Sequence, residues 1–237
     1  MTVTIPVSSL ALRGYLVTPH GEGPWPGVVV LHEAFGLNDD IRSVADRFAA
    51  HGYVAVAPDL FSWASTPRCL VSTFRDLLRG YGPAHDRIDA IRDWLATHEA
   101  SNGRVGVVGF CMGGGFALLA APRRYAVAAV NYGVVPKDAE RVLVGACPIV
   151  ASFGAKDRTL RGHAARLETA LEAIGVDHDV KEYPGASHSF LNRHHGWIAT
   201  LDRVTGFGYD AASADDAWHR LFVFFDQHLA GRSPDSP

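Results

Sequence analysis

The chain has 237 residues and a formal net charge of −3, from 25 acidic and 22 basic side chains. Because the charges nearly balance and no basic tract occurs, nucleic acid and anionic membranes are poor partners, and a small molecule or a protein is favoured. Residues 1–6 lack the basic flank and apolar core of a signal peptide, and no run approaches the ~18 apolar residues of a membrane span, so we expect a cytoplasmic protein without membrane association.

The pattern of apolar residues predicts a mostly parallel sheet covered by helices on both faces. Alternating apolar residues in 3–7 and 10–17 predict an antiparallel hairpin at one sheet edge. Beyond it, valine-rich runs bounded by Gly or Pro alternate with amphipathic stretches of helical length. The predicted strands are residues 27–31, 53–57, 105–108, 127–132, 148–153 and 178–183. The predicted helices are residues 39–50, 85–97, 160–174 and 214–229.

Chain organisation indicates one domain. The length suits a single α/β domain, neither a repeat nor a linker is found, and we expect the domain to span residues 1–230 with a frayed tail at 231–237. Ser213 and Asp216 form a variant capping box before the last helix. Residues 61–83 and 189–212 show no regular pattern, which is typical of lids and binding loops. We therefore expect both to shape the pocket, and leave open whether 61–83 closes over it.

The three cysteines are not expected to form disulfide bonds with one another. Cys69, Cys111 and Cys147 are odd in number and lack Cys-x-x-Cys spacing, which argues against a disulfide framework and structural zinc. Cys147 begins an apolar strand pattern and is predicted to pack in the core. Cys69 lies in the irregular stretch and is predicted to be half-exposed.

Cys111 occupies a different setting, the centre of the pentapeptide Gly-Phe-Cys-Met-Gly at 109–113, directly after an apolar strand pattern. A nucleophile on a tight strand-to-helix turn has strained backbone angles, which small flanking residues permit. The turn also directs the backbone N–H of Met112 at a reacting carbonyl oxygen. The alternative to a catalytic role is that Cys111 is a buried thiol beside an ordinary glycine-containing loop. We favour the nucleophile because the partners it needs are present.

A base and an acid follow in the order that α/β hydrolases use, nucleophile, acid, histidine. Asp157 and His188 each come just past a predicted strand, where short loops aim side chains across the carboxyl edge of the sheet. Taken singly, Asp157 reads as a helix cap and His188 as a surface-loop histidine. Three residues of the right types in the right order favour a catalytic triad.

The loop after the first parallel strand, residues 32–36, supplies a second set of candidates. Hydrolases place here the backbone N–H that completes the oxyanion hole, and Ala34 is the natural donor. Glu33 would lie near the nucleophile, where a negative charge affects formation of the thiolate. The alternative for Glu33 is an exposed loop acid.

Four segments together resemble the dienelactone hydrolase family: His-Glu-Ala-Phe-Gly at 32–36, Ala-Pro-Asp-Leu at 57–60, Gly-Phe-Cys-Met-Gly-Gly at 109–114 and Gly-Ala-Ser-His-Ser-Phe at 185–190. The resemblance implies an α/β-hydrolase fold without a separate cap domain. It also implies a Cys111, His188 and Asp157 triad that hydrolyses a lactone or enol ester with no cofactor. In such a site Glu33 restrains Cys111 until substrate displaces the carboxylate.

Substrate recognition departs from the family pattern. Members that cleave dienelactones hold the substrate carboxylate with arginines, one of them four residues after the histidine, where this chain has Asn192 followed by Arg193. The candidates for contacting the substrate are Arg68, Arg75, Arg79, Arg193 and Phe35. The segment after Asn192, with His194, His195 and Trp197, is longer than a minimal member needs. No acidic or thiol partner stands at ligand spacing there, so we predict no metal site.

We therefore predict a cysteine hydrolase of lactones or activated enol or aryl esters, acting as a monomer or small homo-oligomer. Activated esters are expected because a thiolate is a better leaving group than an ordinary alkoxide. One alternative is a broad carboxylesterase or thioesterase on the same scaffold, which fold alone does not separate. Another is a non-enzymatic redox sensor or ligand-binding protein that uses Cys111.

Overall fold

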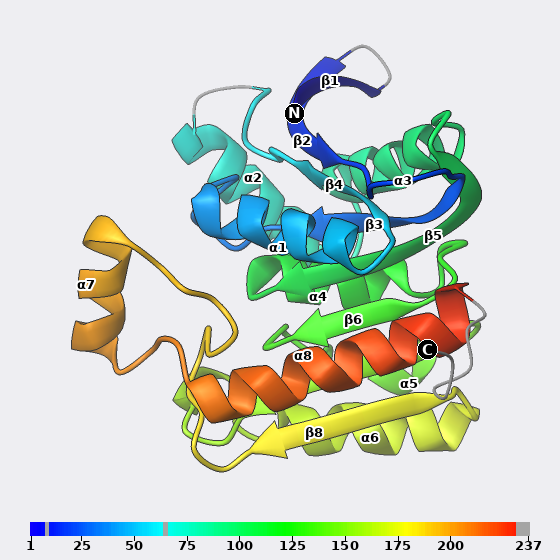
Figure 1. Ribbon diagram of the computed structural model, residues 1–237. Helices are drawn as coiled ribbons and strands as arrows, with labels where there is room; N and C mark the ends of the chain where they lie inside the picture. Colours follow the sequence, from blue (N-terminus) through cyan, green and yellow to red (C-terminus); the bar gives the residue numbers. More distant parts are fainter. Residues whose placement is uncertain (8–9, 64–65, 231–237) are drawn as a thin grey trace.

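The computed structural model describes residues 1–7, 10–63 and 66–230. One eight-stranded sheet runs through the molecule in the order β1-β2-β4-β3-β5-β6-β7-β8 (Figure 1). Its strands are β1 Thr2–Val7, β2 Leu10–Val17, β3 Trp25–Leu31, β4 Val54–Pro58, β5 Ser101–Phe110, β6 Ala128–Asn131, β7 Ile149–Gly154 and β8 His178–Tyr183. Strands β1, β2 and β4 pair antiparallel, and all later pairs are parallel.

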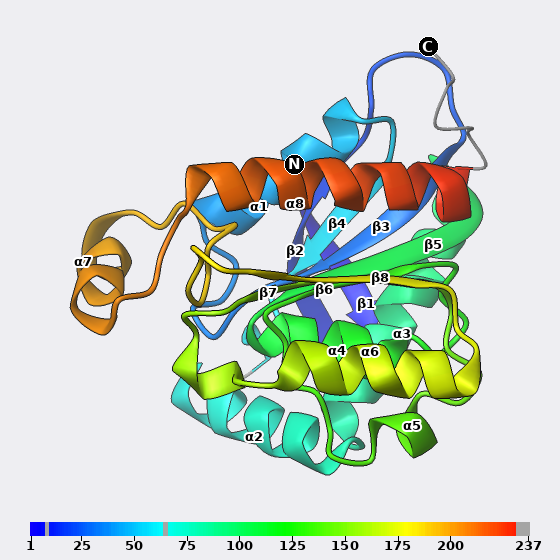
Figure 2. The ribbon, with the colours of Figure 1, turned by 90° about the horizontal axis from the view of Figure 1, so that it is seen from below.

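Helices cover both faces of this sheet. They are α1 Asp39–Ala50, α2 Thr66–Arg79, α3 Pro83–Ala96, α4 Met112–Ala120, α5 Ala139–Val142, α6 His163–Ile174, α7 Gly196–Thr205 and α8 Ala211–Phe225, with a 3₁₀ turn η1 Arg158–Leu160 and a π-helical turn η2 Asp226–Ala230. Figure 2 shows α1 and α8 on one face and α2 to α6 on the other. On the first face, the ring of Phe48 meets those of Trp218 and Phe222. Helix α7 covers neither face and stands off the carboxyl end of the strands (Figure 1).

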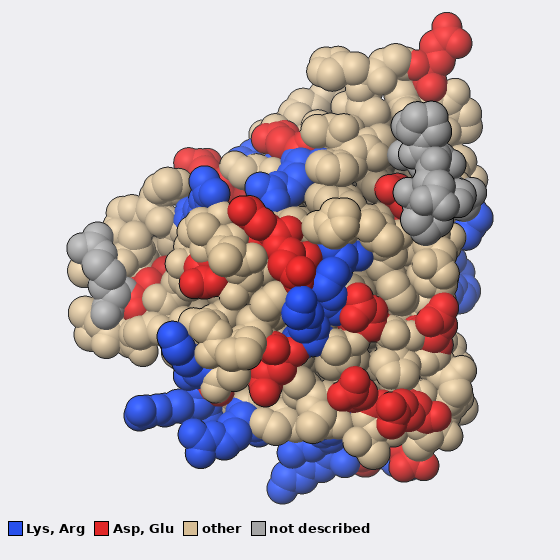
Figure 3. Space-filling model, turned by 60° about the horizontal axis from the view of Figure 1, so that its bottom comes forward, with Lys and Arg blue, Asp and Glu red and all other residues tan. Residues whose placement is uncertain are grey.

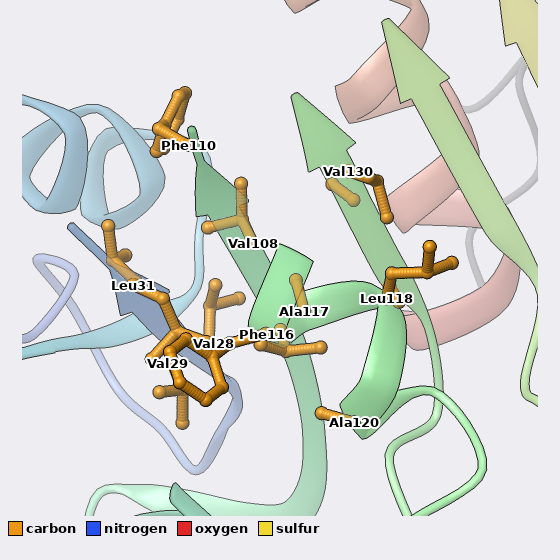
Figure 4. Close-up of a cluster of buried hydrophobic side chains, with 14 of the residues drawn as sticks. Val28, Val29, Leu31, Val108, Phe110, Phe116, Ala117, Leu118, Ala120 and Val130 are labelled. Carbon is orange, nitrogen blue, oxygen red and sulfur yellow. The ribbon is translucent and has the colours of Figure 1, made fainter. Parts of the chain in front are cut away.

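The core centres on α4 and the strands beneath it. Figure 4 shows Phe116 and Leu118 of α4 in one apolar cluster with Val28 of β3 and Val130 of β6. All four side chains are fully buried. Parallel strands buried on both faces read as continuous apolar runs, which is why β3 to β7 are visible in the sequence. The start of α4 is thereby fixed over the carboxyl ends of β3, β5 and β6.

Most predicted elements are confirmed within a few residues. The edge hairpin, the six later strands and the helix at 39–50 are present. The other three helices start or end a few residues from their predicted bounds. The predicted capping box is wrong, because Asp210 caps α8 by accepting a hydrogen bond from Ser213 N, and Asp216 instead accepts from Lys181 Nζ. The predicted tail, 231–237, lies outside the described residues.

Both segments predicted as irregular contain a helix. In α2 the core-facing residues Leu70, Phe74 and Leu77 recur at helical spacing, although the buried side of the helix also carries the polar residues Thr73 and Asp76. Asp76 is buried because its carboxylate accepts a hydrogen bond from Ala84 N at the start of α3. In α7 three large apolar residues face solvent, Trp197 at 69%, Leu201 at 41% and Val204 at 80% exposed, whereas Ile198 is buried. No helix in the described ranges is long and apolar enough to span a membrane.

Candidate active site

Cys111 lies between β5 and α4 with φ 54° and ψ −114°, in the positive-φ region that only glycine adopts readily. Such strain persists only where the surroundings enforce it. Here the turn is so tight that a Cβ on Gly109 would lie 1.9 Å from Gly113 O. The Cys111 side chain is half-buried at the carboxyl edge of the sheet. The predicted strand-turn-helix setting of the pentapeptide is therefore present.

The two predicted oxyanion donors follow neighbouring strands in matching register. Leu31 of β3 pairs with Gly109 of β5, and Ala34 and Met112 each lie three residues further along. Met112 is the first residue of α4, where backbone N–H groups have no partner within the helix. A Cβ on Gly113 would lie 2.2 Å from Leu31 O, so the start of α4 abuts the end of β3. The two backbone segments are thus side by side next to Cys111.

His32 fixes the loop that carries Ala34. Leu60 N donates to its Nε2 at 3.1 Å, so Nδ1 holds the ring proton and donates to Glu33 O at 2.6 Å. Burial lowers the pKa of His32, which keeps the ring neutral in this bridging role. The sequence indicated His32 only as part of a motif and gave it no role. The signal that could have identified it is its position directly after the apolar strand pattern at 27–31.

Asp157 and His188 come together as predicted, His188 Nδ1 lying 2.6 Å from Asp157 Oδ2. The other carboxylate oxygen, Oδ1, accepts hydrogen bonds from Thr159 N at 2.9 Å and Thr159 Oγ1 at 2.6 Å. Asp157 therefore caps η1, as its interpretation as a helix cap predicts, and contacts His188 with its other oxygen. Burial lowers the pKa of His188, but hydrogen bonds to Asp157 and Cys111 outweigh it and raise the pKa to about 10. The contact with Asp157 thus favours the protonated form of the imidazole.

Glu33 is buried, with both carboxylate oxygens hydrogen-bonded. Ser189 Oγ donates to Oε1 at 2.7 Å, and His194 Nε2 lies 2.5 Å from Oε2. The opposite ring nitrogen of His194, Nδ1, lies 2.7 Å from Asp202 Oδ2. Burial lowers the pKa of His194, but the hydrogen bonds and charges of Glu33 and Asp202 raise it to about 9. Glu33 is therefore held by a histidine cation rather than exposed on a loop.

A model of a known protein family matches most of this chain. The model of the Dienelactone hydrolase family covers residues 12–229. The chain belongs to the dienelactone hydrolase family. The "Putative carboxymethylenebutenolidase" of Yersinia pestis is 30% identical over 98% of this chain and 89% of its own length. Protein usf of Aquifex pyrophilus is 31% identical over 94% of this chain and 96% of its own.

Solved structures agree with this assignment. A crystal structure titled "Putative Dienelactone Hydrolase" from Klebsiella pneumoniae is 26% identical and has a TM-score of 0.78, over 96% of this chain and 98% of that one. The resemblance to the dienelactone hydrolase family and the α/β-hydrolase fold, both predicted from sequence, are confirmed.

In this dienelactone hydrolase family member, Asn192 takes the place expected for an arginine and is fully buried. Its Oδ1 accepts a hydrogen bond from the Tyr132 hydroxyl, and its Nδ2 donates to Asp40. Arg193 points elsewhere, with its guanidinium 4.3 Å from the ring centroid of Tyr209. Asn192 therefore joins three elements at the edge of the site, a role that sequence reasoning missed.

The remaining substrate candidates lie on two sides of the site. Arg68, Arg75 and Arg79 are exposed on α2, and Arg75 donates to Ser72 Oγ at 3.3 Å. Figure 3 shows acidic and basic side chains interspersed over the face it draws, with basic ones along its lower left edge. Phe35 is half-buried, its ring centroid 5.5 Å from that of His194. Contact of these residues with a substrate stays a prediction.

The other cysteines differ from Cys111. Cys69 is fully buried in α2, so the prediction of a half-exposed thiol is wrong; its position on the buried stripe of that helix explains the difference. Cys147 is half-buried against the core, and burial raises its pKa to about 12. In the ranges that the structure describes, no group of three or more His, Cys, Asp or Glu side chains is arranged to hold a metal ion.

Proposed function

We propose that this hydrolase cleaves lactones or activated esters through a covalent acyl-cysteine on Cys111, with His188 as acid and base and Asp157 as its partner. The observation that carries the proposal is the strained Cys111 turn together with the hydrogen-bonded His188 and Asp157 pair. Nucleophilic catalysis needs these parts: a thiol presented on a rigid turn, a base within reach, and an acid that orients the base.

The first step is acyl transfer to sulfur. The Cys111 thiolate attacks the ester carbonyl carbon, and the new C–S bond forms as the carbonyl oxygen takes the negative charge. The tetrahedral adduct then collapses, the bond to the leaving oxygen breaks, and protonated His188 supplies a proton to that oxygen. In a lactone the released hydroxyl or enol stays attached to the acyl group.

The second step is hydrolysis of the thioester. Neutral His188 takes a proton from water as the water oxygen attacks the carbonyl carbon. Collapse of this adduct breaks the C–S bond, releases the carboxylic acid and restores the thiolate beside the His188 imidazolium. Asp157 fixes the ring orientation in both steps and stabilises its positive form, as in triads generally.

Charge on the carbonyl oxygen would be stabilised by the N–H groups of Ala34 and Met112. Their matching positions after β3 and β5 support this assignment. His32 would hold the Ala34 loop in place through Glu33 O and Leu60 N. A preorganised pair of donors stabilises the adduct without rearrangement at the moment of reaction.

The nucleophile also determines the substrate class. The adduct on Cys111 can expel either the thiolate or the alcohol, and the thiolate leaves more easily than an ordinary alkoxide. Productive collapse therefore favours esters whose leaving group is acidic, such as phenolates and enolates. Simple alkyl esters and amides are expected to be poor substrates.

The test is hydrolysis of an aryl acetate and an enol lactone by the wild type and by Cys111→Ala. We expect the variant to lose at least about 10³-fold in kcat. Mass spectrometry of acid-quenched wild type should find the acyl group on the peptide that contains Cys111. Retention of most activity by Cys111→Ala would disprove the covalent route, and no turnover of any activated ester, with reversible oxidation of Cys111, would favour the redox-sensing alternative.

A further inference from the structure

His194 is a third histidine with a buried side chain at the site, after His32 and His188, and the proposed triad does not use it. It lies between two carboxylates, with Glu33 at 2.5 Å from one ring nitrogen and Asp202 at 2.7 Å from the other. The His194 and Glu33 side chains are only 1% and 2% exposed. A ring that donates from both nitrogens must carry two protons, so His194 is a cation in this arrangement.

His194 and Asp202 both come from the segment around α7. His194 precedes the helix and Asp202 lies within it, whereas Glu33 follows β3, 161 residues earlier than His194. Helix α7 stands away from the body (Figure 1). Within α7, Ile198 and Asp202 are buried. The buried ionic contact is thus a principal attachment of α7 to the site.

The charged surroundings of His194 are mixed. Glu33 faces it from the loop after β3, and Asp202 faces it from α7. A pocket of about 470 Å³ beside the pair is also lined by Lys156, Arg193 and Asp210. The groups in hydrogen-bond contact with the ring are both acidic, which makes the cationic form the one that this environment holds.

Glu33 is restrained from its other side as well. Ser189, whose hydroxyl donates to Oε1, has φ 60° although it is not glycine. Ser189 directly follows His188, so the same strained turn presents the triad histidine and a hydrogen bond to Glu33. A strained backbone that persists at this position indicates that the surrounding contacts enforce it.

We propose that His194, oriented by Asp202, is a positioning residue that offsets the charge of Glu33 and holds its carboxylate against Ser189, so that Glu33 does not oppose the Cys111 thiolate. The proposal rests on the function proposed above. The loop that carries Glu33 abuts the start of α4 beside Cys111, since a Cβ on Gly113 would lie 2.7 Å from His32 O. A buried anion near a thiol disfavours the thiolate, and a neighbouring cation cancels that effect. The attachment of α7 to the site and the formation of the Cys111 thiolate would then both depend on the contact between His194 and Glu33.

The experiment measures the rate of Cys111 alkylation by iodoacetamide against pH, which requires no ester substrate. The peptide containing Cys111 is followed by mass spectrometry so that Cys69 and Cys147 do not contribute. In His194→Gln we expect the midpoint of the pH profile to rise by about one to two pH units. Asp202→Asn should shift it in the same direction by a smaller amount. His195→Gln, at the adjacent exposed histidine, should leave it unchanged.

Two further variants separate positioning from loss of fold. His194→Lys restores a cation and should return the midpoint most of the way to the wild-type value. In a Glu33→Gln background, His194→Gln should no longer shift the profile, because the charge that it offsets is gone. An unchanged midpoint in His194→Gln, or a shift of the same size in the Glu33→Gln background, would overturn the proposal.

The result is distinguishable from failure of the proposed function. If the wild type hydrolyses no activated ester but the alkylation profiles shift as expected, the hydrolase proposal fails while His194 still positions Glu33. If esters are hydrolysed through Cys111 but His194→Gln leaves both alkylation and the pH profile of kcat/KM unchanged, the positioning role fails alone.

Discussion

Gly113 and Leu31 approach so closely that a Cβ on Gly113 would lie 2.2 Å from the Leu31 carbonyl oxygen. This contact joins the start of α4 to the end of β3, and therefore sets the distance between the two predicted oxyanion donors. No L side chain fits there unless one backbone segment moves. The contact involves backbone on both sides, so a rotamer change cannot relieve the overlap.

Gly113→Ala should therefore reduce both stability and activity. Displacing packed backbone costs about 1–3 kcal/mol in the free energy of unfolding, and a shifted Met112 N–H should lower kcat on the order of tenfold or more. Gly185→Ala is the matched control, because a Cβ there meets nothing within 4 Å and its φ is not positive. Urea unfolding and aryl ester hydrolysis of the two variants test this, and equal behaviour would contradict it.

The pair of Asp157 and His188 should make stability depend on pH. The pKa of His188 is raised from 6.5 to about 10, so in that interval the folded chain binds a proton that the unfolded chain lacks. Its contribution to stability is therefore fully present below pH 6.5 and lost as the pH rises through about 10. Asp157→Asn keeps the shape but removes the charge, so most of this contribution should disappear.

The measurement is the unfolding free energy of wild type and Asp157→Asn at several pH values. The difference between them should be largest near pH 6.5 and should shrink as the pH approaches about 10. His194 remains in both proteins and so cancels in the comparison. A difference that is constant with pH would show that Asp157 does not stabilise the protonated ring. The same variant should lose about 10²- to 10⁴-fold in kcat.

The sequence predicted the central strands, the turn at Cys111 and the contact between His188 and Asp157 because each leaves a local signal. Valine-rich runs mark strands buried on both faces, and Cys111 lies in a pentapeptide whose glycines serve a single turn geometry. Asp157 and His188 follow strands whose carboxyl ends meet at one edge. Their contact could be inferred from topology, without knowledge of side-chain positions.

The parts that were not predicted depend on contacts between distant segments. Helix α2 was missed although Leu70, Phe74 and Leu77 recur at helical spacing, because the same side of the helix carries Asp76, which is buried only through its hydrogen bond from Ala84 N in α3. The arrangement of His194 and Asp202 was missed because they meet across the start of α7 and are brought to Glu33 only by the fold. Their separation in the sequence matches no metal or catalytic motif, so pattern reasoning gave His194 no partner.

His32 should matter to catalysis through the loop that it bridges. His32→Gln cannot both donate to Glu33 O and accept from Leu60 N with the same geometry, so one buried backbone group loses its partner at about 1–3 kcal/mol. We expect kcat to fall more than KM rises, because in the proposed mechanism the Ala34 N–H acts on the developing oxyanion. His20→Gln, at an exposed histidine, is the control. A rise in KM alone would indicate a role in binding instead.

Substrate charge should distinguish this chain from relatives that hold a carboxylate with arginine. Asn192 is occupied by Tyr132 and Asp40, and Arg193 by Tyr209, so neither side chain is available to pair with a substrate anion without rearrangement. We expect neutral aryl esters to exceed their carboxylate-bearing counterparts by about tenfold or more in kcat/KM, with the ratio falling at high salt. A preference for the carboxylated ester would contradict this, and substitution of Arg68, Arg75 and Arg79 in turn by glutamine would then identify the residue on α2 that binds it.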